Sequence, residues 1–120
     1  MRSRAGYADH RSSTGWSPPA DVCETGDGFV VVVELPGMAR DEFDVTATSA
    51  SLTIRGRRNG PGCEPVQYVR LERGHGSFVR QFSFATSLDV AGMTASFADG
   101  ILTVTLPKAA EARGRRVDVE

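Results

Sequence analysis

The sequence predicts an all-β protein, built as an antiparallel sandwich between residues 19 and 108. Short runs of β-branched and aromatic residues recur along the chain, and clusters of turn residues separate them. No segment shows the hydrophobic period of about 3.6 residues that marks an amphipathic helix. Many short strands at regular spacing are typical of a two-sheet sandwich, and 120 residues suit one domain with a modest core.

Hydrophobic periodicity places the expected strands from residue 21 onward. Residues 21–25 form a short strand candidate, which ends at a Gly-Asp-Gly turn. Residues 29–35 are almost continuously apolar, which predicts a strand buried on both faces. Apolar and polar positions alternate in further runs, which predicts half-buried strands at 43–48, 51–55, 78–84, 95–97 and 101–106. Asp99-Gly100 predicts a hairpin turn, and Asp41 and Glu42 fit a single helical turn at 39–43.

The two ends of the chain lack a sustained period. Residues 1–18 are rich in Arg, Ser and Gly and are expected to be a flexible N-terminal arm, in which Trp16 either makes a sticky contact or docks on the domain edge. Residues 109–120 form a C-terminal extension in which Val117 and Val119 point to the same side of an extended chain. These valines are therefore either a plug for an apolar groove or a chance pair in a frayed tail.

The connection at residues 56–76 has about 20 residues, which is more than a hairpin needs. Its centre is strand-like and consists of Val66, Gln67, Tyr68 and Val69. Such a strand can pair with the sheet edge of another subunit and cover it.

Arg80 follows this excursion and has the same parity as the apolar residues of its strand. A charge on an apolar face is costly unless it is paired. Either Arg80 extends to water at the sheet edge, or a carboxylate reaches it. Glu64 and Glu72 are the candidate partners, and the pair would cross an interface if the excursion belongs to a neighbouring subunit.

Residues that could support catalysis or nucleic-acid binding are not found in a recognisable pattern. The net charge is −1, so no global field favours nucleic acid or an anionic membrane. The arginine clusters at 57–58 and 113–116 have no interleaved aromatic residues, which indicates a role in solubility. The loop at 74–78 lacks the Walker A, kinase and G-x-S-x-G patterns. We therefore expect no enzymatic activity, no catalytic residues and no cofactor.

The cysteine spacing indicates whether a metal site is expected, and the length of the apolar runs indicates whether the chain crosses a membrane. Cys23 and Cys63 lack CxxC spacing and histidine partners, so no zinc site is expected. They are either incidental thiols or, at Cys63, an inter-subunit disulfide or redox switch. No run reaches the length of about 20 apolar residues that spans a bilayer, and no signal-peptide core follows the N-terminus. The expected location is the cytoplasm, with no membrane span.

Six separated stretches carry a family resemblance. They are residues 19–25 (PADVCET), 29–37 (FVVVVELPG), 52–56 (LTIRG), 72–73 (ER), 76–82 (GSFVRQF), and the run from Ala95 through 100–102 (GIL) to 106–108 (LPK). In order and spacing they resemble the α-crystallin domain of bacterial small heat-shock proteins, the Hsp20 family. The closing run is similar to the A-x-x-x-x-G-(V/I)-L signature of that family.

The resemblance implies a fold and a function. The fold is an immunoglobulin-like antiparallel β-sandwich with a flexible arm and a C-terminal extension. The function is that of an ATP-independent holdase chaperone of the stress response, which keeps partly unfolded client proteins from aggregating. The implied partners are the protein itself and non-native clients, with no nucleic acid.

The resemblance also assigns residues to interfaces. The family forms dimers by exchanging the strand of the long excursion, so the implied dimer interface comprises Val66, Gln67, Tyr68, Val69, Glu72 and Arg80. The C-terminal I-x-I/V motif of the family maps onto Val117 and Val119. The groove of another dimer that accepts this plug maps onto Phe43, Val45, Ala47, Ala95 and Phe97.

The chain departs from the family pattern at three points. Phe84-Ala85 stands where members often have Leu-Pro, which should leave the fold unchanged. The plug has valines in place of isoleucines, and each lost methylene removes up to about 0.8 kcal/mol of burial. The arm is short, and together with the valine plug it predicts a small or labile assembly.

Two other functions share the sandwich and remain open from the sequence. One is an adaptor or co-chaperone of the p23/CS type, which predicts a monomer. The other is a structural coat or vesicle-associated member of the same fold.

Overall fold

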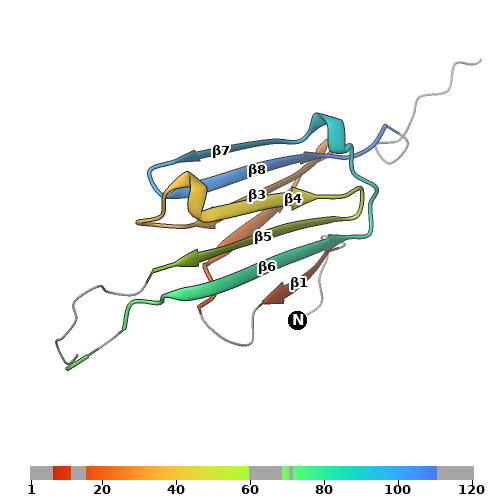
Figure 1. Cartoon of the computed structure of the whole chain (residues 1–120). Helices are drawn as coiled ribbons and strands as arrows, with labels where there is room; N and C mark the ends of the chain where they lie inside the picture. Colours follow the sequence, from red (N-terminus) through yellow and green to blue (C-terminus); the bar gives the residue numbers. More distant parts are fainter. Residues whose placement is uncertain (1–6, 12–15, 60–68, 71, 111–120) are drawn as a thin grey trace, which may run out of the picture.

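Two four-stranded antiparallel sheets stack into a β-sandwich (Figure 1). The computed structural model describes residues 7–11, 16–59, 69–70 and 72–110. The first sheet has the order β1 (Tyr7–Arg11), β6 (Gly76–Phe84), β5 (Ser51–Arg58), β4 (Phe43–Ala47). The second has the order β2 (Ala20–Glu24), β3 (Gly28–Glu34), β8 (Ile101–Pro107), β7 (Thr94–Ala98). The predicted all-β sandwich is confirmed.

The core forms between the sheets from alternate residues of the long strands. Phe29, Val31 and Val33 of β3 are buried and lie opposite Leu106, Val104 and Leu102 of β8. Strands β5 and β6 supply the facing layer, with buried side chains at Leu52, Ile54, Phe78, Phe82 and Phe84. The period of two in each strand therefore determines which side chains enter the core.

The expectation that β3 is buried on both faces is wrong. Val30 and Val32 point to the outer face of the second sheet and are only half-buried. Their register neighbours on β8 are Thr105 and Thr103, and the described residues place no further layer over this face.

The arm contains a strand that the sequence did not predict. Strand β1 pairs antiparallel with β6, with Ala8 opposite Ser83. The edge of β6 has backbone N–H and C=O groups that need partners, and β1 supplies them. The position of β1 therefore depends more on the edge of β6 than on a hydrophobic pattern within the arm. The composition of residues 1–18 carries no such signal.

The predicted turns are confirmed. Asp99 and Gly100 both have positive φ, at 54° and 75°, as the two-residue hairpin between β7 and β8 requires. The expected helical turn is the 3₁₀ helix η1 (Arg40–Glu42), which starts after Ala39. The Glu42 carboxylate accepts a hydrogen bond of 2.6 Å from the Ala39 backbone N–H and so satisfies the start of the turn. A second 3₁₀ turn, η2 (Val90–Gly92), precedes β7.

Ile54→Ala tests the assigned facing of the strands. Ile54 is fully buried, so the substitution should lower the free energy of unfolding by about 2–5 kcal/mol, because it removes buried methyl groups and leaves a cavity. Val79→Ala is the matched control, because Val79 points outward and is 36% exposed, and it should cost less than about 1 kcal/mol. Urea unfolding followed by circular dichroism at one protein concentration measures both values. Equal losses would contradict the facing assigned here.

Candidate functional site

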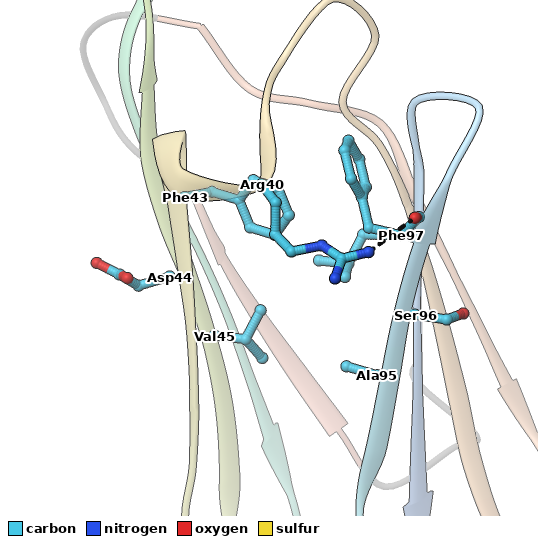
Figure 2. A pocket seen from close by; sticks show the side chains of 8 residues that line it. Arg40, Phe43, Asp44, Val45, Ala95, Ser96 and Phe97 are labelled. Atoms are coloured by element: carbon cyan, nitrogen blue, oxygen red, sulfur yellow. Dashed lines mark hydrogen bonds between the residues drawn. The ribbon is translucent and has the colours of Figure 1, made fainter.

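A hydrophobic groove lies between β4 and β7, at the side of the sandwich where each sheet ends. β4 is the last strand of the first sheet and β7 is the last strand of the second. The groove has a volume of about 280 Å³, and its lining comes from both strands, from η1 and from Leu102 of β8 (Figure 2). Because both strands are edges, backbone N–H and C=O groups are available on either side of the groove.

Four of the five groove residues predicted from the sequence line this groove together. Phe43 and Val45 come from β4, and Ala95 and Phe97 come from β7. The rings of Phe43 and Phe97 meet edge to face, with centroids 4.9 Å apart. Ala47, the fifth residue, lies further along β4, where it packs against the core and does not line the groove. Arg40, Asp44, Ser96 and Leu102 complete the lining and were not predicted.

The chemistry of the groove suits an extended apolar segment. Its walls are aromatic and aliphatic, and the two strand edges offer hydrogen bonds to a peptide backbone. Within the described part of the chain, no group of three or more His, Cys, Asp or Glu side chains is placed to hold a metal ion. The predicted plug residues Val117 and Val119 lie outside the described residues.

Arg80 is buried inside the sandwich, with only 1% of its surface exposed, so it does not extend to water at the sheet edge. It lies on β6 between Arg11 of β1 and Ile54 of β5. Its Nη1 donates a hydrogen bond to the carbonyl oxygen of Pro18, and its guanidinium carbon lies 5.1 Å from the ring centroid of Phe82. Arg80 therefore joins the segment that precedes β2 to the opposite sheet.

The excursion between β5 and β6 is described only in part. Val66, Gln67, Tyr68, Cys63 and Glu64 lie outside the described residues. Val69 is fully exposed. Glu72, proposed as a partner of Arg80, pairs instead with Arg70 in this chain, with 3.0 Å between Arg70 Nη1 and Glu72 Oε1. Both of these side chains are largely exposed, so the pair contributes little stability.

Sequence reasoning missed a cluster at the base of the excursion, formed by Trp16, Arg58, Gly74, Gly76 and Phe78. Trp16 Nε1 donates a 3.0 Å hydrogen bond to the Gly76 carbonyl oxygen, and its ring meets the ring of Phe78 edge to face at 5.3 Å. The Arg58 guanidinium carbon lies 4.0 Å from the Trp16 ring centroid. Of the two roles considered for Trp16, docking on the domain edge is the one observed.

The role in solubility expected for Arg58 is wrong. Its Nε donates a 2.7 Å hydrogen bond to the Gly74 carbonyl oxygen, and its Nη1 donates a 3.2 Å hydrogen bond to the Pro36 carbonyl oxygen. Arg58 therefore connects the two ends of the excursion with the loop after β3. A single arginine beside a strand end carries no sequence signal for this role, whereas the only tryptophan of the chain was a visible candidate for docking.

Of the two cysteines, Cys23 lies on β2 as an exposed free thiol. No helix in the described parts of the chain is long and apolar enough to span a membrane.

The two-sheet sandwich has the fold of solved small heat-shock proteins. A family model described as Hsp20/alpha crystallin family matches residues 21–120. The chain belongs to this family.

Relatives and solved structures agree with this assignment. Small heat shock protein C4 of Rickettsia felis is 32% identical over 114 residues, which cover 94% of this chain and 70% of the relative. The crystal structure of a small heat-shock protein from Xylella fastidiosa superposes with a TM-score of 0.72 at 33% identity, covering 89% of this chain and 99% of that one. The crystal structure of hspA from Xanthomonas axonopodis gives a TM-score of 0.69 at 34% identity, covering 79% and 96%.

Gly74→Ala tests the contact between the arm and the excursion. A Cβ added at Gly74 would lie 2.9 Å from the Cβ of Trp16, so the indole should be displaced from its contacts. We expect the emission maximum of the single tryptophan to move to longer wavelength and its quenching by acrylamide to increase. Gly26→Ala is the control, because a Cβ there meets nothing within 4 Å. Identical spectra for both variants and the parent protein would rule out this packing of Trp16.

Proposed function

We propose that the protein is an ATP-independent holdase, which binds partly unfolded client chains and keeps them from aggregating. The observation that carries this proposal is the groove between β4 and β7, where apolar walls lie beside two strand edges that no described strand covers. An unfolding client offers the matching chemistry, namely apolar side chains on an extended backbone. Membership of a chaperone family supports the same reading.

We propose further that the subunits pair by exchanging the strand centred on residues 66–69. Among the described strands β2 pairs only with β3, so its other edge can accept a strand from a neighbouring subunit. The full exposure of Val69 supports this proposal, because an exposed β-branched residue gains from burial against a partner. Arg80 contacts Pro18 just before β2, so it holds in place the segment that presents this edge.

The tail is proposed to dock in the groove of a subunit from another dimer. Val117 and Val119 would occupy the space between Val45 on one wall and Ala95 on the other. The eight residues between Lys108 and Val117 can span up to about 27 Å when extended, which is enough to reach a neighbouring molecule. Docked tails would cover the groove until a client competes for it.

The division into an arm at 1–18, a domain at 19–108 and an extension at 109–120 is part of the proposal, and so is a cytoplasmic location. Contacts at both domain boundaries support the division. Pro18 is held by Arg80, and Lys108 Nζ lies 3.0 Å from the Glu24 carboxylate and 5.5 Å from the Phe29 ring centroid. Pro18 and Lys108 are thus held in place at the two proposed boundaries.

Suppression of aggregation tests the holdase proposal. The protein should reduce light scattering from a heat-denatured client at a near-stoichiometric ratio without ATP, because binding needs only exposed apolar surface. Adding ATP should not change the result. Static light scattering of the protein alone gives its mass in parallel. No suppression, with a strict monomer at tens of micromolar, would favour an adaptor of the p23/CS type instead.

Arg80→Ala should disturb the assembly more than Arg113→Ala does. Removing the buried guanidinium leaves a cavity and takes away the donor to the Pro18 carbonyl, so the segment before β2 should loosen. Size-exclusion chromatography with light scattering measures the mass of each variant, and circular dichroism checks that the sandwich persists. If both variants show the oligomer profile of the parent protein, Arg80 has no part in assembly.

A further inference from the structure

Arg40 is a cation at the mouth of the hydrophobic groove. It is the first residue of η1 and reaches across from the start of β4 towards β7, above Val45 and Ala95 (Figure 2). Its Nη2 donates a hydrogen bond of 3.5 Å to the Phe97 carbonyl oxygen, which is at the long limit for such a bond. Arg40 is exposed, and a guanidinium has five N–H donors, so most of its capacity is free for a ligand.

Glu42 and Asp44 are the acids placed nearest the groove, and neither pairs with Arg40. The Glu42 carboxylate faces the Ala39 backbone N–H, to which it is hydrogen-bonded. Asp44 lines the groove but points its carboxylate away from Arg40 and from the space between the strands (Figure 2). Among the described residues, Arg40 forms no ion pair. The groove therefore combines apolar walls with an exposed guanidinium that forms no ion pair with the described residues.

The tail carries the complementary pattern. Asp118 and Glu120 alternate with Val117 and Val119. In an extended segment, alternate side chains point to opposite sides, so valines directed to the floor of the groove leave the two carboxylates at its mouth. The exposed Arg40 guanidinium reaches across the groove between the two strands (Figure 2). Two arginines, Arg115 and Arg116, come before the valines and would be repelled by it.

We propose that Arg40 makes the groove selective for the acidic end of this protein's own tail, supplied by another subunit. This inference rests on the proposed docking of the tail and adds its specificity. Asp118 and Glu120 bind towards the Arg40 end of the groove, and the two arginines lie towards the Ala95 end. This charge pairing determines in which of its two directions the tail lies along the groove. Two identical valines alone would fit the groove in either direction. The charge pair also supplements the smaller burial of valine.

An electrostatic contribution makes tail docking sensitive to salt. The Arg40 site is exposed, and attraction between exposed charges falls as the Debye length shortens from about 10 Å at 0.1 M to about 3 Å at 1 M salt. Contacts between the valines and the groove walls do not weaken in this way. Salt therefore loosens the tail and exposes the groove without unfolding the domain.

Peptide binding with charge reversal tests the inference. The receptor is the full chain carrying Val117→Ala and Val119→Ala, so that its own tail does not compete. The probe is a fluorescein-labelled peptide of residues 109–120, followed by anisotropy. A second peptide carries Asp118→Lys and Glu120→Lys, and a third replaces both valines by alanine. Receptor variants are Arg40→Ala, Arg40→Glu and, as the matched control, Arg55→Glu, an exposed arginine on the outer face of β5.

We expect Arg40→Glu to weaken binding of the native peptide by about three- to tenfold, and Arg55→Glu to change it by less than about twofold. The lysine peptide should show the reverse preference and bind the Arg40→Glu receptor better than the parent. Arg40→Ala should lose most of the salt dependence. Circular dichroism and the melting temperature verify that each receptor is folded.

The outcomes separate the inference from the proposal beneath it. If the native and alanine peptides bind the parent receptor equally, the valines do not dock, and both the proposed docking and the inference are wrong. If binding depends on the valines but is the same for the Arg40→Glu and parent receptors, docking stands and the role of Arg40 is overturned. Valine-dependent binding that is lost with Arg40→Glu and recovered with the lysine peptide supports both.

Discussion

The two sheets bury their apolar faces against each other but do not close into a barrel, so β1, β2, β4 and β7 each keep an edge that no described strand covers. Unpaired edges are a liability, because they can pair with any extended chain. In this protein binding is proposed at three of these edges. β4 and β7 flank the hydrophobic groove, and β2 is the proposed edge for strand exchange. The centre of the sandwich supplies stability, and the function is assigned to its rim.

Polar side chains hold the connecting segments in place. Arg80 crosses the interior to the carbonyl oxygen of Pro18, and Lys108 reaches Glu24 from the end of β8. Trp16 and Arg58 join the arm to both ends of the excursion. These side chains position the segments entering and leaving the domain, and Trp16 also packs against the core through Phe78. The arm and the excursion are thereby coupled, because displacing Trp16 would also disturb the loop that precedes β6.

Much of the fold follows from local pattern. The alternation around Leu102, Val104 and Leu106 correctly places those residues in the core, and Asp99-Gly100 forms the predicted turn. The same reasoning failed for Val30 and Val32, since apolar composition does not reveal whether a second layer covers a face. It also missed β1, whose pairing depends on the edge of β6. For the groove, the family resemblance identified Phe43, Val45, Ala95 and Phe97 but not Arg40, which no motif marks.

Local sequence pattern is enough to place most of the core-facing side chains, to locate the Asp99-Gly100 turn, and to show that one charge, at Arg80, emerges on an apolar face. Each of these properties depends on residues within a few positions of one another, so a period of two or a turn dipeptide is enough to reveal it. Which edges adjoin depends instead on how the two sheets pack against each other. Arg40 meets Phe97 across 57 positions, and Trp16 meets Gly76 across 60. Such contacts arise when two sheets stack in one particular alignment, and that alignment is a property of the whole packed core.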